Sequence, residues 1–205
     1  MLIDFEGMDP KDAYHILTQT VIPRPVAWVL SENPDGDYNL APFSFFTPIT
    51  SNPPLLMISV GKKPAEGVSK DTRVNIEARK NFVVHIAHRD LAAAVTESSR
   101  TLPHGESELK NLDLELVDFE GSSLPRLKDC HVAFACELYD IKEIGAGPQS
   151  LVFGKVTRVW VSDDAARYDD KNRLTFSGAA IDPIGRLGGS EYVTFGEILK
   201  IPRPS

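Results

Sequence analysis

Runs of apolar residues, either continuous or alternating with polar ones, predict a chain made mainly of β-strands. The clearest runs are residues 25–31, 54–61, 81–88, 131–145 and 150–161. The last two are long and flank a short turn at 146–149, so we expect them to pair. We interpret three polar stretches as connections: residues 32–38, 100–128 and 163–176. The second of these contains one short predicted strand at 114–119.

Apolar residues at helical spacing occur in short segments, which are 10–19, 69–80 and 89–99. Asp9 and Pro10 mark the start of the first, because Asp caps helices and Pro is favoured at the first helical position. Ser69 or Asp71 is the expected cap of the second helix, and Asp90 that of the third. The period of the second helix directs these side chains toward the core: Val68, Thr72 and Ile76, with Val74 and Ala78 as further candidates.

One stretch, NLAPFSFFTPITSNPP at residues 39–54, is mostly apolar like a buried strand and yet contains four prolines. Proline cannot donate a hydrogen bond within a sheet, so it is confined to edges and bulges. The stretch is therefore either an edge strand with an aromatic core face or the wall of a ligand site. A planar polar ring suits such a wall, because it needs apolar faces and amide-type partners at its edge.

Together these elements predict one domain over residues 1–205, mainly β and closed into a barrel, with a few short helices. The net charge is -7 and the pI is about 5.2, which argues against a general nucleic-acid surface. No apolar run approaches the roughly 20 residues of a membrane-spanning helix. The acidic N-terminus does not resemble a signal peptide, so we expect a cytoplasmic protein with no membrane partner.

Histidine and cysteine residues do not form a catalytic or metal-binding motif, and no metal site is expected. Cys130 and Cys136 are interpreted as reduced, packed thiols, since six residues along a strand separate them by roughly 20 Å. His85 and His88 are expected on opposite faces of a strand. His104 lies in a polar loop and is interpreted as a solvated side chain rather than a substrate contact. GAGPQS at 145–150 lacks the third glycine of a dinucleotide fingerprint.

The segment SVGKKPAEGVSKDTRVN, residues 59–75, combines a strand end, lysines, a loop and a helix start. Helix N-termini expose unpaired N–H groups and the positive end of the helix dipole, and so attract anions. Lys70 adds charge, and Ser69 and Thr72 add hydroxyl donors. The segment is either a phosphate cradle or a capped helix beside solvated lysines.

Four motifs in this order and spacing resemble the flavin reductase-like family, which has the FMN-binding split-barrel fold and includes flavoredoxin-type proteins. The motifs are PRPVAWVLS, NLAPFSFFTPITSNPPLLMISVG, KDTRVNIEARKNFVVHIA and GRLGGSEY, and the resemblance covers roughly residues 14–198. It implies a homodimer of split barrels, each with FMN near the subunit interface. Many relatives carry a histidine on the late strand, where this chain has Arg158 and Trp160, so a histidine role in nicotinamide binding is not transferred.

The resemblance also implies which residues hold the flavin. Residues 39–44 and 50–52 would line the ring and ribityl chain, 59–61 the ribityl chain and phosphate, and 70–72 the phosphate. Arg186 and Tyr192 would approach the flavin or the substrate pocket. The full set is Arg24, Asn39, Ala41, Pro42, Phe43, Ser44, Thr50, Ser51, Asn52, Ser59, Gly61, Lys70, Asp71, Thr72, Arg186 and Tyr192.

The implied activity is that of an FMN-dependent oxidoreductase in which NADH or NADPH passes hydride to the flavin, with no catalytic side chain required. Two alternatives stay open. One is an FMN electron carrier that is reduced by a protein donor and does not react with NAD(P)H. The other is a non-enzymatic domain that binds flavin or only keeps the barrel.

Overall fold

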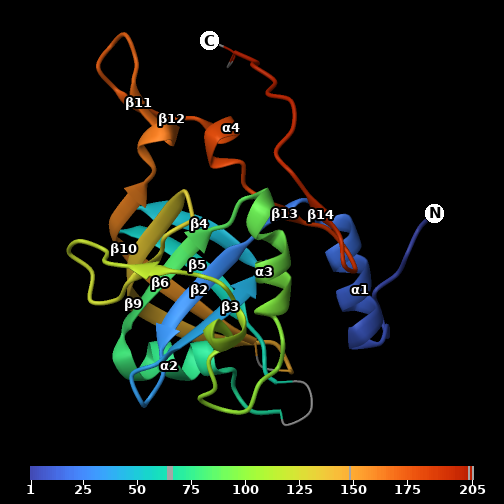
Figure 1. Cartoon of the computed structure of the whole chain (residues 1–205). Helices are drawn as coiled ribbons and strands as arrows, with labels where there is room; N and C mark the ends of the chain where they lie inside the picture. Colours follow the sequence, from blue (N-terminus) through green and yellow to red (C-terminus); the bar gives the residue numbers. More distant parts are fainter. Residues whose placement is uncertain (64–66, 148, 203, 205) are drawn as a thin grey trace.

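The computed structural model describes residues 1–63, 67–147, 149–202 and 204. Its centre is an antiparallel seven-stranded sheet in the order β3-β2-β6-β9-β10-β5-β4 (Figure 1). The bounds are β2 Ala27–Glu32, β3 Tyr38–Phe43, β4 Phe46–Ser51, β5 Pro54–Val60, β6 Asn81–Ile86, β9 Val132–Ile144 and β10 Gln149–Val161. These strands confirm the mainly β prediction, and the predicted pairing of the two long runs is the β9–β10 ladder. The turn predicted at 146–149 includes residue 148, which lies outside the described residues.

The sheet is buried on both faces, and two hydrophobic clusters share its strands. On β2, Trp28 and Leu30 belong to one cluster and Ala27 and Val29 to the other, as the alternation of a strand requires. Full burial of each such large side chain contributes roughly 1.5–3 kcal/mol. Gly154 on β10 admits the ring of Phe82, because a Cβ there would lie 2.3 Å from the ring.

The residues 39–54 form two strands, not one. β3 and β4 are joined at Ser44 and Phe45, and they form the two opposite edges of the sheet. Pro42 and Pro48 therefore lie in edge strands, which agrees with the prediction of an edge, whereas Pro53 lies in the turn after β4 and Pro54 is the first residue of β5. The single chain stretch thus supplies both borders of the open barrel.

Four α-helices accompany the sheet in the described chain: α1 Pro10–Thr20, α2 Asp71–Arg79, α3 Ala92–Glu97 and α4 Gly178–Ile181. The Asp9 side chain accepts a hydrogen bond from the Lys11 N–H, which confirms the first cap. The second cap was wrong, because Lys70 occupies the N-cap position and makes no side-chain bond to the helix. In Figure 1, α2 crosses one end of the barrel and α1 stands at its side.

Other local predictions were wrong as well. The third helix is preceded by a 3₁₀ turn at Arg89–Leu91 whose N-cap is His88, so Asp90 caps nothing. Val68, which precedes α2, and Ala78 within it are exposed, whereas Asn75 of the same helix is buried. A polar side chain faces the interior there because it donates hydrogen bonds to Ser31 and Asn33 of the barrel end. Sequence period alone does not reveal such a partner.

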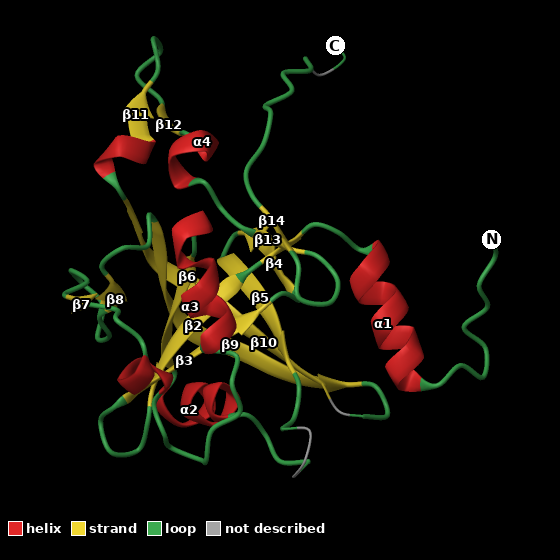
Figure 2. Ribbon diagram, turned by 45° about the vertical axis from the view of Figure 1, so that its right-hand side comes forward, coloured by secondary structure: helices red, strands yellow, loops and turns green. Residues whose placement is uncertain are grey.

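Short strands complete the fold. β1 Arg24–Pro25 pairs with β13 Gly185–Arg186, which pairs with β14 Tyr192–Val193, and β7 Leu116–Val117 pairs with β8 Arg126–Leu127. The stretch 163–176, predicted as a connection, forms a 3₁₀ turn at Asp163–Ala165 and a hairpin of β11 Ala166–Tyr168 and β12 Leu174–Phe176. Figure 2 shows this hairpin projecting from the barrel. In the described part of the chain, no helix is long and apolar enough to cross a membrane.

Candidate functional site

Three cavities that share lining residues, together called the groove, extend from the β3 edge across to β4, β5 and β10. The first, about 70 Å³, lies between β3, the start of α2 and residues 98–102. Past Pro42 and Lys70 it meets the second, about 200 Å³, which Ser44, Ser59 and Gln149 border. The third, about 580 Å³, is mostly apolar and is lined by Phe45, Phe46, Met57, Ile144 and Leu151, among others. A polar end therefore leads continuously into an apolar end.

At the polar end Lys70 and Thr72 lie together, as the sequence predicts. Lys70 is half-buried, and burial lowers its pKa. Its Nζ stands 5.5 Å from the centre of the Phe43 ring, and no described carboxylate forms an ion pair with it. The Thr72 hydroxyl accepts a bond from the Asn39 side-chain amide at 2.9 Å, which leaves its own proton free to donate into the cavity.

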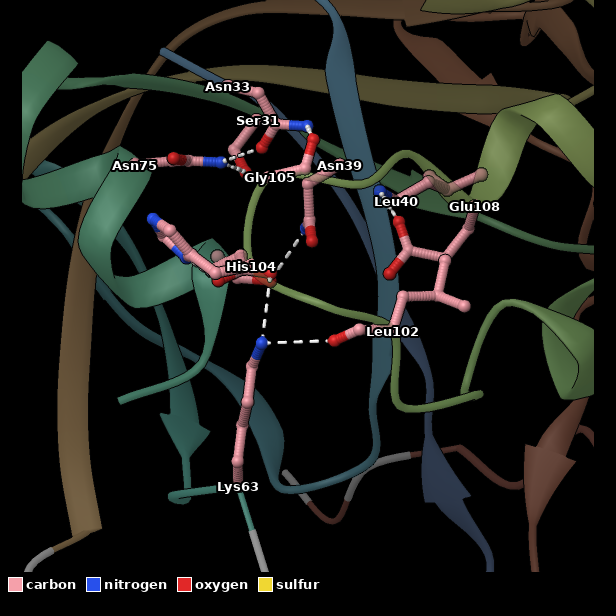
Figure 3. A network of polar contacts seen from close by, with 12 residues as sticks. Ser31, Asn33, Asn39, Leu40, Lys63, Asn75, Leu102, His104, Gly105 and Glu108 are labelled. Carbon is pink, nitrogen blue, oxygen red and sulfur yellow. Dashed lines mark hydrogen bonds and ion pairs between the residues drawn. The ribbon is translucent and has the colours of Figure 1, made fainter. Parts of the chain in front are cut away.

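Asp71 joins Lys63 and His104 in a polar network beside these groups, and Figure 3 shows Lys63, Leu102 and His104 of this network. One carboxylate oxygen of Asp71 accepts from Lys63 Nζ at 3.3 Å, and the other pairs with His104 Nδ1. Lys63 also donates to the Leu102 carbonyl at 3.1 Å. His104, expected to be a solvated loop side chain, therefore contacts Asp71, although 59% of it is exposed. Both oxygens of Asp71 are engaged within the chain.

Glu108, which sequence reasoning missed, also borders the polar cavity. It lies in the 3₁₀ turn Glu108–Asn111, and its Oε2 accepts the Leu40 N–H of the β3 edge at 2.9 Å. Burial, with Asp71 nearby, raises its pKa to about 7. The sequence around Lys63 and Glu108 does not predict them as site residues, because their partners come from distant segments. The paired lysines at 62–63 were the one local feature that pointed to a charged site.

In the middle cavity the predicted residues Pro42, Phe43, Ser44, Ser59 and Gly61 do come together. Gln149, at the start of β10, joins them unpredicted, and its Oε1 accepts a bond from Ser59 Oγ at 3.4 Å. A Cβ at position 61 would lie 3.3 Å from the Gln149 amide, so glycine admits this side chain. The cavity thus presents hydroxyl and amide groups beside an aromatic wall.

Arg24 belongs to the framework of the site more than to its surface. Its guanidinium donates to the carbonyls of Thr18 and Val21 at the end of α1, and to that of Leu187 at 2.9 Å. Burial lowers its pKa. Its Nε lies 3.4 Å from Ser44 Oγ, so it fixes the turn that joins the polar and apolar cavities.

Several other predicted residues lie outside this groove in the single chain. Thr50, Ser51 and Asn52 are exposed at the β4–β5 turn, at the opposite end of that hairpin from Ser59. Arg186 stacks on Tyr192, with its guanidinium 4.7 Å from the ring centre, and bonds to nearby carbonyls of its own loop. None of these residues borders the three cavities.

The family model named "Flavin reductase like domain" matches residues 19–178, which include all seven strands of the main sheet and every residue lining the three cavities except Tyr14 and Leu17. The chain belongs to the flavin reductase-like family. The likeness also confirms the predicted split-barrel fold, which flavoredoxin of Desulfovibrio vulgaris shares at a TM-score of 0.73 and 20% identity, over 98% of this chain and 97% of that one.

Two solved structures resemble this flavin reductase-like chain more closely. Nitrilotriacetate monooxygenase component B from Bacillus cereus is 33% identical, with a TM-score of 0.89 over 98% of both chains. The 2-nitrobenzoate 2-nitroreductase NbaA of Pseudomonas fluorescens is 29% identical, with a TM-score of 0.87 over 100% of this chain and 96% of that one. Both likenesses extend over essentially the whole molecule.

Arg158 and Trp160, which stand where a histidine is expected in many relatives, lie away from the groove. Arg158 and Trp160 are near the end of β10, whereas Gln149 starts it. The Arg126 guanidinium lies 3.5 Å from the centre of the Trp160 ring, and Arg158 approaches Gly121. In this chain the two residues pack against the 121–127 segment.

Proposed function

We propose that this protein is an FMN-binding oxidoreductase that uses NAD(P)H to reduce its flavin. The observation that carries the proposal is the continuous groove, in which a cationic helix start leads along an aromatic and amide-lined wall into an apolar cavity. FMN has the same order of chemistry: a phosphate, a polar ribityl chain and a planar ring. The family of the chain makes a flavin the natural occupant.

The polar end has the donors that a phosphate requires. Lys70 supplies a cation, Thr72 a free hydroxyl proton, and the first turn of α2 unpaired N–H groups. Residues 98–101, Ser-Ser-Arg-Thr, line the opposite side of the same cavity. Asp71 does not conflict with a phosphate here, because its carboxylate is ion-paired with Lys63 and hydrogen-bonded to His104.

The middle and apolar cavities fit the ring. Phe43 and Pro42 offer flat apolar contact, and Ser59 and Gln149 offer hydroxyl and amide groups for the polar ring edge. Bound FMN would supply the hydride chemistry, accepting hydride from the nicotinamide and passing electrons onward. The chain would hold the ring, exclude water with Phe45 and Met57, and leave the large cavity for the second ring.

We place a homodimer contact at the same apolar cavity. Its rim includes Ile144 and Phe45, which are 51% and 40% exposed, and Leu17 and Val21 of the α1 end are also exposed. A second copy of the chain would cover these side chains. It would also give a role to Thr50, Ser51 and Asn52, which lie away from their own groove and would face the groove of the other copy.

The first test is an FMN titration followed by flavin fluorescence. Lys70→Ala combined with Thr72→Ala removes charge-assisted hydrogen bonds worth roughly 1.5–3 kcal/mol each, so affinity should fall by at least tenfold per group. Lys155→Ala, an exposed lysine on β10, is the matched control and should change nothing. Unchanged FMN affinity in the double variant would mean that the phosphate lies elsewhere.

The second test is anaerobic mixing of the FMN-loaded protein with NADH or NADPH. Bleaching of the flavin absorbance identifies a reductase and its preferred donor. A flavin that is stable to both nucleotides but reduced by a protein donor would identify an electron carrier. A protein that takes up no FMN at all would contradict both assignments.

A further inference from the structure

The polar cavity contains an acid where an anion site would be expected to avoid one. Glu108 is 8% exposed and borders the same cavity as Lys70, Thr72 and Arg100. Its Oε2 accepts the Leu40 N–H, and among the described residues no other residue is hydrogen-bonded to this side chain. In Figure 3 the other carboxyl oxygen points away from Leu40, toward the middle of the polar network.

The charged groups around Glu108 come from several elements. Asp71, at the start of α2, adds a negative charge that is paired with Lys63 after β5 and with His104 of the 101–107 segment. Lys70 and Arg100 face the cavity from its two sides, and Arg100 is itself paired with Glu97. An ionised Glu108 would therefore cancel one of the few cationic charges available to an anion.

We propose that Glu108 makes phosphate binding in this cavity proton-linked: the acid is protonated when the anion is bound and repels it when ionised. This inference rests on the proposed function, since it takes the phosphate of FMN as the anion. When protonated, the free carboxyl oxygen can donate a hydrogen bond to the phosphate instead of opposing it. Glu108 would thus be a residue that couples flavin retention to pH.

The electrostatics of the cavity support a transition in the physiological range. Burial, opposed by the hydrogen bond from the Leu40 N–H, raises the pKa of Glu108 to about 7, with smaller opposite contributions from Asp71, which raises it, and Lys63, which lowers it. A bound anion favours the neutral acid, so binding draws a proton from solution at pH values near 7 and above. By the same linkage, the affinity for the anion decreases as the pH rises through this range.

The test compares FMN titrations at pH 6 and pH 8.5 for the wild type, Glu108→Gln and Glu106→Gln. Gln keeps an acceptor for the Leu40 N–H, and Glu106, exposed two residues earlier, is the matched control. The FMN phosphate ionises in the same way in all three experiments. The ratio of the dissociation constants of two proteins at one pH therefore isolates the effect of the substituted side chain. At pH 8.5 Glu108→Gln should bind FMN at least about tenfold more tightly than the wild type, because an acid with a pKa of about 7 must take up a proton at this pH when the anion binds.

At pH 6 the two proteins should bind alike, and Glu106→Gln should follow the wild type throughout. Calorimetry at pH 7.5 in buffers of different ionisation enthalpy should show proton uptake that Glu108→Gln lacks, and riboflavin, which has no phosphate, should show none in either protein. Parallel pH profiles for the wild type and Glu108→Gln would overturn this inference while leaving FMN binding intact. No FMN binding at any pH would instead overturn the proposed function.

Discussion

The two edge strands that residues 39–54 form, β3 and β4, are neighbours in sequence and have opposite surroundings. In β3 the side chains are buried or half-buried, and Asn39 and the Leu40 N–H are bound by Thr72 and Glu108 from other elements. In β4 nearly every residue is exposed. Among the described residues its end has only local bonds, such as that from the Asn52 N–H to Thr50 Oγ1.

The difference shows that one edge of the barrel is completed by its own chain and the other is left open. α2 and the 98–108 segment cover the β3 edge with polar contacts, and these contacts enclose the phosphate end of the proposed flavin site. An open edge strand is a surface that another chain can use. Substitutions at the β3 edge should therefore affect folding and binding together, and those at the β4 edge binding alone.

The largest effect is expected for Asp71→Asn, which removes the charge shared by Lys63 and His104. Lys63 is then left buried without a carboxylate, which typically costs about 3–5 kcal/mol. Urea unfolding followed by circular dichroism measures the loss. The control is Glu77→Gln in the same helix, because Glu77 is 55% exposed and its pair with Arg73 is worth less than about 1 kcal/mol.

A decrease of less than about 1 kcal/mol in the free energy of unfolding of Asp71→Asn would contradict the proposed difference between the β3 and β4 edges. It would mean that the polar contacts at the β3 edge contribute no more than surface ion pairs, and that the hydrophobic clusters alone hold this border.

The pH dependence of stability gives the next effect. The folded protein holds the proton of Glu108 more tightly than the unfolded chain, since burial raises its pKa from 4.5 to about 7. The contribution of Glu108 to the free energy of unfolding is therefore fully present below pH 4.5. It is lost as the pH rises through about 7, by about 3 kcal/mol in all. In Glu108→Gln the free energy of unfolding should fall less between pH 5 and pH 8 than in the wild type. Equal slopes would show that Glu108 ionises as freely as in the unfolded chain.

Much of the framework was predictable because it depends on neighbours in sequence. Apolar runs predicted the long strands, and Asp9 before Pro10 predicted the cap of α1. The prolines of residues 39–54 predicted an edge strand of the sheet. The cluster of Lys70 and Thr72 was predictable for the same reason, since a helix start and its flanking residues are local.

The rest of the site was not predictable because its contacts are long-range. Lys63, His104 and Glu108 meet across loops, and Gln149 reaches Ser59 from a different hairpin. From the sequence, His104 in particular is interpreted as a solvated side chain, whereas in the folded chain it contacts Asp71. Likewise, the polar pattern of residues 163–176 hid a hairpin with Tyr168, Leu174 and Phe176 exposed.

The smallest effect on stability is expected at the open edge, with Thr50→Ala and Ser51→Ala combined. Both side chains are exposed, so the free energy of unfolding should stay within about 0.5 kcal/mol of the wild type. If these residues face the groove of a second copy, FMN affinity should still fall several-fold, while sedimentation shows an unchanged dimer. The control is Thr175→Ala, which removes a threonine hydroxyl from the projecting hairpin and should leave the FMN affinity unchanged. An unaltered FMN affinity in the double variant would show that Thr50 and Ser51 play no part in flavin binding, so that the site is completed within each chain.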